Sequence, residues 1–226
     1  MSPNGDEIRA YLGRMFNNAL RQPGMHGGEM TLRLYLDALA FAHGQQDTSR
    51  EIDALKKYGA FSSTGVQGAF RALLPGLESS HPASLESGLQ TMAASIYAEI
   101  GRRQGWTDFD RALTADEHAA MNQSVGTWCT RDRSMSDLLT AFGSPSLLSG
   151  SSNPRYPKTL IYAGEGPEAP CLSFHVWNSF EGMYPQTRYP EPMLLAVRRE
   201  GGGFTGSFMF APLGEQVRRG LSPAAG

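Results

Sequence analysis

The chain has 226 residues, of which 19% are charged, and its formal net charge is −2. The near-neutral balance argues against a dedicated nucleic-acid binder, which would show a basic excess or a basic stripe. It also excludes a chain that charge repulsion keeps disordered. No basic segment followed by an apolar run opens the sequence, and the longest apolar-leaning stretch, 32–42, is far shorter than the ~20 residues of a membrane span. We therefore expect a soluble, cytoplasmic protein with neither nucleic acid nor membrane as partner.

Apolar side chains recur at helical spacing through residues 1–143, which we expect to form a helical part. Two capping boxes, in which a Ser or Thr is followed three residues later by an acid, predict further helix starts at Thr114 and Ser134. The other predicted helices cover 6–20, 29–42, the stretch from Thr48 to near Gly59, 62–74 and 82–104.

The pattern changes to that of short strands in residues 144–214. Residues 143–157 hold five Ser, three Pro and two Gly, which predicts a turn-rich connector. The strands expected after it cover 158–163, 171–177, 192–199 and 204–210. Short connections between successive strands predict an antiparallel meander. We expect an α+β fold, with the helical half packed against a four-stranded antiparallel sheet in one shared core, and a weakly ordered tail over 215–226.

The first candidate binding residues lie on the predicted strand 171–177 and in the loop after it. Leu172, Phe174 and Val176 alternate with Ser173, His175 and Trp177, so the second set lies on the opposite face of the sheet. His175 and Trp177 lead into a long loop, 178–191, whose candidate anchors are Phe180, Tyr184, Arg188 and Tyr189. Three interpretations stay open: the two strand residues pack under the loop, they join it in a recognition surface, or His175 is a general base.

A second candidate is the connector 128–133, with Arg131 and Arg133 as binding residues. These arginines would lower the pKa of Cys129 and make it a reactive thiolate, or they pair with Asp132 in a structural connector. Cys129 and Cys171 have no metal-ligand spacing, and we expect two reduced thiols, although a bridge between them stays open. Phosphate-loop, dinucleotide-binding, metal-binding and nucleophile-elbow motifs are absent, so we expect no cofactor and no metal site.

Two stretches resemble segments of known bacterial proteins. Residues 21–28, Arg-Gln-Pro-Gly-Met-His-Gly-Gly, precede an Ala/Leu-rich helix and resemble the Arg-Pro-Gly-Met-Tyr-x-Gly segment of many small bacterial proteins. Some of those are predicted immunity proteins of polymorphic toxins. Gln22 and His26 depart from that pattern. Residues 134–162, with a short helix, a Phe-Gly-x-Pro turn and paired strands, are similar to the layout of bacterial immunity and small lipoprotein-type binding domains. The resemblance implies a binding protein rather than an enzyme.

The resulting hypothesis is a non-catalytic protein-binding module, of immunity type, that binds and blocks a bacterial toxin or another protein. One alternative is an enzyme without a familiar motif that uses His175 with Asp132 or Cys129. Another is an accessory protein that assembles with copies of itself.

Overall fold

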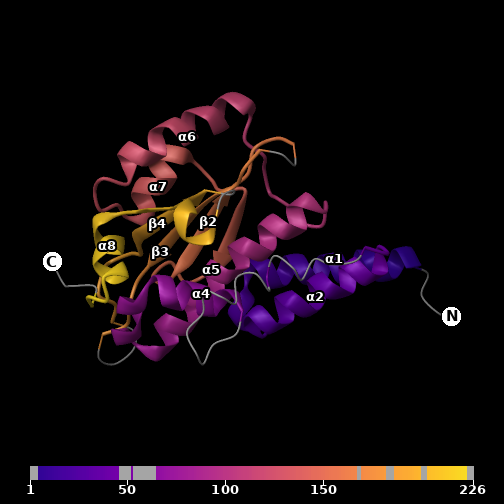
Figure 1. Cartoon of the computed structure of the whole chain (residues 1–226), viewed down its shortest axis with the longest axis horizontal. Helices are drawn as coiled ribbons and strands as arrows, with labels where there is room; N and C mark the ends of the chain where they lie inside the picture. Colours follow the sequence, from indigo (N-terminus) through magenta and orange to yellow (C-terminus); the bar gives the residue numbers. More distant parts are fainter. Residues whose placement is uncertain are drawn as a thin grey trace.

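The structure, a computed structural model, describes residues 5–45, 52, 65–166, 169–181, 186–199 and 203–222. Its centre is a five-stranded antiparallel sheet whose strands lie in chain order, with helices on both faces (Figure 1). The predicted α+β class and the antiparallel meander are confirmed, but the sheet has one strand more than expected. The strands are β1 (Leu147–Gly150), β2 (Lys158–Tyr162), β3 (Leu172–Trp177), β4 (Met193–Arg199) and β5 (Phe208–Phe210).

The predicted helices within the described residues are all present. Both capping boxes form: the hydroxyls of Thr114 and Ser134 each accept a hydrogen bond from the backbone N–H three residues on, and the carboxylate of the acid there accepts one from the backbone N–H of Thr114 or Ser134. The helix expected between Thr48 and Gly59 lies outside the described residues except at Ile52, which is helical and buried. The helices are α1 (Gly5–Arg21), α2 (Gly28–Ala42), α4 (Val66–Leu73), α5 (Pro82–Arg103), α6 (Ala115–Trp128), α7 (Met135–Phe142) and α8 (Pro212–Arg218).

Both faces of the central strands are covered, so every residue of β2 and β3 is buried, including Ser173 and His175, which alternate with apolar residues in β3. One face packs against α5, against α1 at β1 and against Phe70 of α4, whereas α2 packs on α1 and α5. The core on this face includes Ile161, Trp177 and Leu195. The other face packs against α6 and α7, and its core includes Leu160 and Phe174. Helices α5 and α7 therefore cover opposite faces of the sheet.

Two elements differ from the sequence predictions. β1 lies within the predicted connector 143–157, where it pairs with β2 through only four residues. The pattern Leu-Leu-Ser-Gly is too short to show a periodicity, so pairing with β2 decides its structure. α8 occupies the beginning of the tail that we expected to be weakly ordered, and Val217 is fully buried there. Pro212 suits a first helical turn, and the Asp132 carboxylate accepts a hydrogen bond of 2.8 Å from the Leu213 N–H.

Helix α5 is tied to the sheet by polar groups as well as by packing. Arg198 of β4 forms a buried ion pair with Glu99 of α5. Arg102 donates to Gly164 O at 3.0 Å and to the carbonyls of Gly166 and Ala169, so it fastens the connection between β2 and β3. Both arginines therefore help to hold α5 against the sheet.

Helices α1 and α2 form an antiparallel hairpin that extends away from the sheet (Figure 1). The segment 21–28 forms its turn, where Gly27 and Gly28 adopt φ values of 86° and 67° that only glycine enters readily. The Glu29 carboxylate accepts hydrogen bonds from the first two backbone N–H groups of α4, at 2.6 and 2.8 Å, and one from the Tyr97 hydroxyl at 3.1 Å. These bonds anchor the base of the hairpin.

Candidate functional site

His175 lies in the interior between the sheet and the helices and is fully buried. Its Nδ1 is 3.1 Å from the Thr159 hydroxyl, and its ring packs against the rings of Phe70 and Phe208. Burial, with a smaller contribution from the positive charge of Arg198, lowers the pKa of His175 to about 3. Trp177 is also fully buried. Of the three interpretations left open, the one in which these two side chains join the loop in a recognition surface is therefore wrong, because both are buried in the core.

Cys129, one of the two proposed catalytic partners of His175, lies on the other side of the sheet. Cys129 belongs to the core on the α6 side of the sheet, whereas Phe70, the neighbour of His175, belongs to the core on the α5 side. Burial raises the pKa of the Cys129 thiol to about 11, so neighbouring arginines do not make it a thiolate at neutral pH. Cys171 lies in the core on the α5 side, and the two cysteines do not form a disulfide.

The loop 178–191 is closed by its own hydrogen bonds. Asn178 Oδ1 accepts from the Tyr189 N–H at 3.1 Å and its Nδ2 donates to the Tyr189 carbonyl at 2.9 Å. Arg188 donates to Glu181 at 2.7 Å, and the ring of Phe180 packs against His81 and Tyr156. The predicted anchors Phe180, Arg188 and Tyr189 are thus half-buried contacts of the fold. Tyr184 lies outside the described residues.

The connector with Arg131 and Arg133 lies beside the end of that loop, because the Leu194 N–H donates to the Arg133 carbonyl at 2.7 Å. The Arg133 guanidinium lies over the ring of Trp128, 4.8 Å from its centroid. Asp132 caps α8 instead of pairing with the arginines beside it in sequence. Arg131 is exposed. The sheet and its loops therefore bring the two predicted binding segments together, although most of their side chains are engaged in holding the fold.

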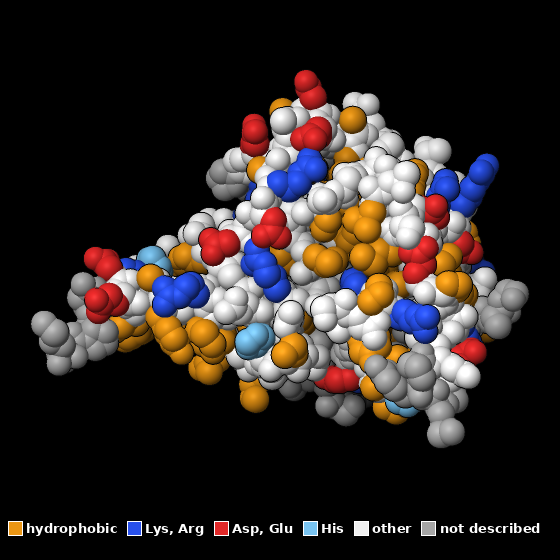
Figure 2. All heavy atoms as spheres, turned by 180° about the vertical axis from the view of Figure 1, so that it is seen from behind, with side chains coloured by type: hydrophobic (Ala, Val, Ile, Leu, Met, Phe, Trp, Pro, Cys, Tyr) orange, Lys and Arg blue, Asp and Glu red, His pale blue; other side chains and the backbone are white. Residues whose placement is uncertain are grey.

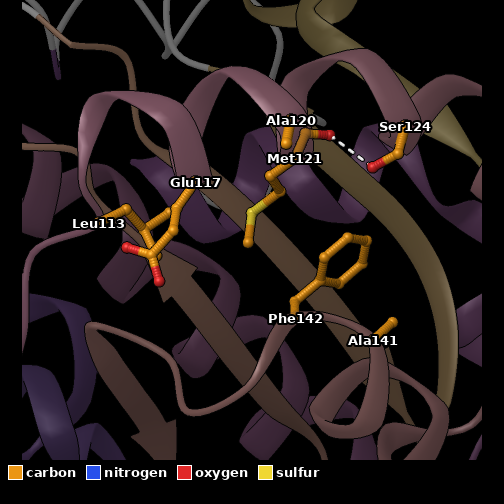
Figure 3. Close-up of a pocket in the computed structure, with 7 residues that line it drawn as sticks. All are labelled: Leu113, Glu117, Ala120, Met121, Ser124, Ala141 and Phe142. Atoms are coloured by element: carbon orange, nitrogen blue, oxygen red, sulfur yellow. Dashed lines mark hydrogen bonds between the residues drawn. The ribbon is translucent and has the colours of Figure 1, made fainter.

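Sequence reasoning missed an open groove of about 390 Å³ between α6 and α7 (Figure 3). Met121 and Phe142 line its apolar part, and Glu117 lies toward one end. A hydrogen bond from the backbone of Thr114 is the main cause that lowers the pKa of Glu117, and this carboxylate also accepts a 2.8 Å hydrogen bond from Arg111. Glu117, the acid among the described residues that line the groove, is therefore a helix cap in an ion pair, which is a poor proton donor for catalysis.

The second feature that sequence reasoning missed is the outer face of the α1–α2 hairpin. Most side chains on the exposed line of α2 are large and apolar: Met30 is 79% exposed, Leu34 63% and Phe41 87%. Figure 2 shows hydrophobic side chains gathered along the edge of the hairpin where it projects from the body. The buried residues Leu32, Leu36 and Leu39 face the core from the opposite side of the same helix. Apolar residues on both sides of a helix are the sequence signal that could have found this surface.

The described residues contain no group of three or more His, Cys, Asp and Glu side chains that could hold a metal ion. Among the helices in the described part of the chain, none is long and apolar enough to cross a membrane. Comparison with protein-family models, with curated proteins and with solved structures found no match to this chain.

Proposed function

We propose that this chain is a non-catalytic protein-binding module and that the outer face of α2, defined by Met30, Leu34 and Phe41, makes the contact. The exposure of these three side chains, between 63% and 87%, is the observation that carries the proposal. Large apolar side chains gathered on a projecting surface are typical of protein–protein contact sites, because their removal from water stabilises the complex.

The shape of the hairpin supports the same function. Its base is fixed to the body by Glu29, which joins α2 to α4 and to Tyr97. The hairpin is thus held in place and presents its outer face without a large ordering cost on binding. Phe41 and Met30 are residue types that interfaces favour, since an aromatic ring gives much contact area and Met adapts to its partner.

The immunity-type role belongs to this proposal as one of its forms. It rests on the resemblance of residues 21–28 and 134–162, and it assigns a bacterial toxin as the bound protein. The segment 21–28 forms the turn that leads into α2, so one of the two resembling segments directly precedes the helix that carries the proposed contact surface.

A binding experiment with the full chain tests the proposal. The bait is the tagged wild-type chain, the candidates are the products of the neighbouring genes, and binding of each is measured by titration with purified protein. We expect Phe41→Glu to weaken binding by at least tenfold, because a carboxylate would have to be buried at the interface. Leu221→Glu, at a position that is 56% exposed and far along the chain, is the matched control and should leave binding unchanged.

The same titration separates the hairpin from the predicted loop. If Arg188→Ala weakens binding while Phe41→Glu does not, the binding site is the loop 178–191 and our assignment to α2 is wrong. Equal binding by wild type and both variants contradicts both assignments.

A further inference from the structure

The exposed line of α2 has the spacing of a coiled-coil seam. Met30, Leu34, Asp37 and Phe41 are all exposed and are separated by four, three and four residues. This alternation is the one that two helices use when they pack side by side along their length. Three of the four positions are apolar, so the line is suited to another helix.

The one polar member of the seam indicates the direction in which the second helix runs. In a parallel pair, Asp37 would lie opposite Asp37 of the other helix, and two carboxylates would be brought together at the interface. In an antiparallel pair of identical helices with the two-fold axis between residues 35 and 36, Met30 lies opposite Phe41 and Leu34 lies opposite Asp37. Both layers share that one axis, so the antiparallel orientation keeps the two Asp37 carboxylates apart, whereas the parallel orientation brings them together.

Arg33 provides an opposite charge for Asp37 across the proposed interface. It flanks the seam one turn before Asp37, with its Nε 3.8 Å from the Asp37 carboxylate in the same helix. Across the antiparallel two-fold axis, Arg33 of each copy comes level with Ala38 of the other copy, one residue from Asp37, so its long side chain can meet that carboxylate. The two copies would therefore exchange two opposite-charge contacts, which specify register and orientation.

We propose that a second copy of this chain packs on the outer face of α2, with the two α2 helices antiparallel. This inference rests on the proposed function and names the partner of the same surface. A helix of 15 residues is about 22 Å long, so the contact area falls toward the low end for specific interfaces. We therefore expect a reversible dimer that dissociates on dilution.

Sedimentation equilibrium of the full chain over a range of concentrations tests the dimer, and charge variants test its orientation. Arg33→Glu makes positions 33 and 37 both acidic, and Asp37→Arg makes them both basic. In a dimer of either variant, like charges therefore meet across the interface, and each variant alone should lose at least tenfold in dimer affinity. An equimolar mixture of the two should associate again, because each acidic site then meets a basic one. The mixture does not restore the pair within either helix, so recovery can come only from contact between chains.

Cysteine cross-linking provides a second measurement that does not depend on charge. Mixing Met30→Cys with Phe41→Cys should give a mixed disulfide under mild oxidation, whereas Met30→Cys alone should not form a dimer through residue 30. The native thiols Cys129 and Cys171 are buried and give little background. Thermal unfolding of each variant identifies any that fails to fold, and the comparison then uses those that do.

A wild-type chain that stays monomeric at high concentration overturns this inference. If Phe41→Glu still abolishes binding of another protein in that case, the proposed function stands and only the second copy is wrong. The proposed arrangement is also wrong if Arg33→Glu and Asp37→Arg leave the dimer affinity unchanged and Met30→Cys by itself forms a disulfide-linked dimer.

Discussion

Acidification is expected to destabilise the folded chain through His175. In the folded state its pKa is lowered from 6.5 to about 3, chiefly by burial and to a smaller extent by Arg198. Between these two values the unfolded chain binds a proton that the folded chain does not. The contribution is therefore fully present above pH 6.5 and is lost as the pH falls toward 3.

The size of the effect follows from the proton linkage. Each pH unit well below 6.5 costs about 1.4 kcal/mol, so lowering the pH from 7.5 to 5.5 costs about 1.3 kcal/mol through this group alone. The assay is urea unfolding of the wild type and of His175→Gln at the two pH values. The free energy of unfolding should fall by about 1.3 kcal/mol more in the wild type than in the variant.

Equal pH dependence in the two proteins would refute the reasoning, because it would mean that His175 takes up a proton in the folded state. A histidine that does so is accessible to water, and the role of His175 in an exposed site would have to be reconsidered. A fall in the free energy of unfolding that occurs in the wild type but not in His175→Gln supports the position of His175 in the core.

Three further predictions concern packing, capping and reactivity. Gly88→Ala should lower the free energy of unfolding by about 1–3 kcal/mol or more, because the added Cβ would lie 2.1 Å from the Trp177 ring. Gly126→Ala, where the added Cβ meets nothing within 4 Å, should instead raise it by up to about 1 kcal/mol. Chemical denaturation measures both. Glu29→Gln should lower the free energy of unfolding by about 1–3 kcal/mol, because Oε1 and Oε2 each accept one N–H of α4 and the amide replaces one of these oxygens with an NH2 group that cannot accept. An undiminished stability would contradict that role. Cys129 should react slowly with a thiol reagent at neutral pH in the native chain and rapidly in urea; fast native labelling would show that its thiol is not buried as described.

Local sequence determined the helices and most of the strands of this protein. The capping boxes at Thr114 and Ser134 predict helix starts because their hydrogen bonds join residues three apart. The α+β order followed from the change of apolar spacing near residue 143. β1 could not be predicted in this way, because its four residues become a strand only through pairing with β2.

The tertiary structure alone decided which surfaces are available for binding. His175 lies on the predicted polar face of its strand, yet α4 and β5 enclose it, and no spacing in the sequence indicates that the sheet is covered on both faces. Conversely, Leu34 and Phe41 belong to a helix that was predicted correctly, but their exposure depends on how the hairpin projects from the body. Helical periodicity fixes which residues share a face, whereas the packing of distant segments determines which face meets water.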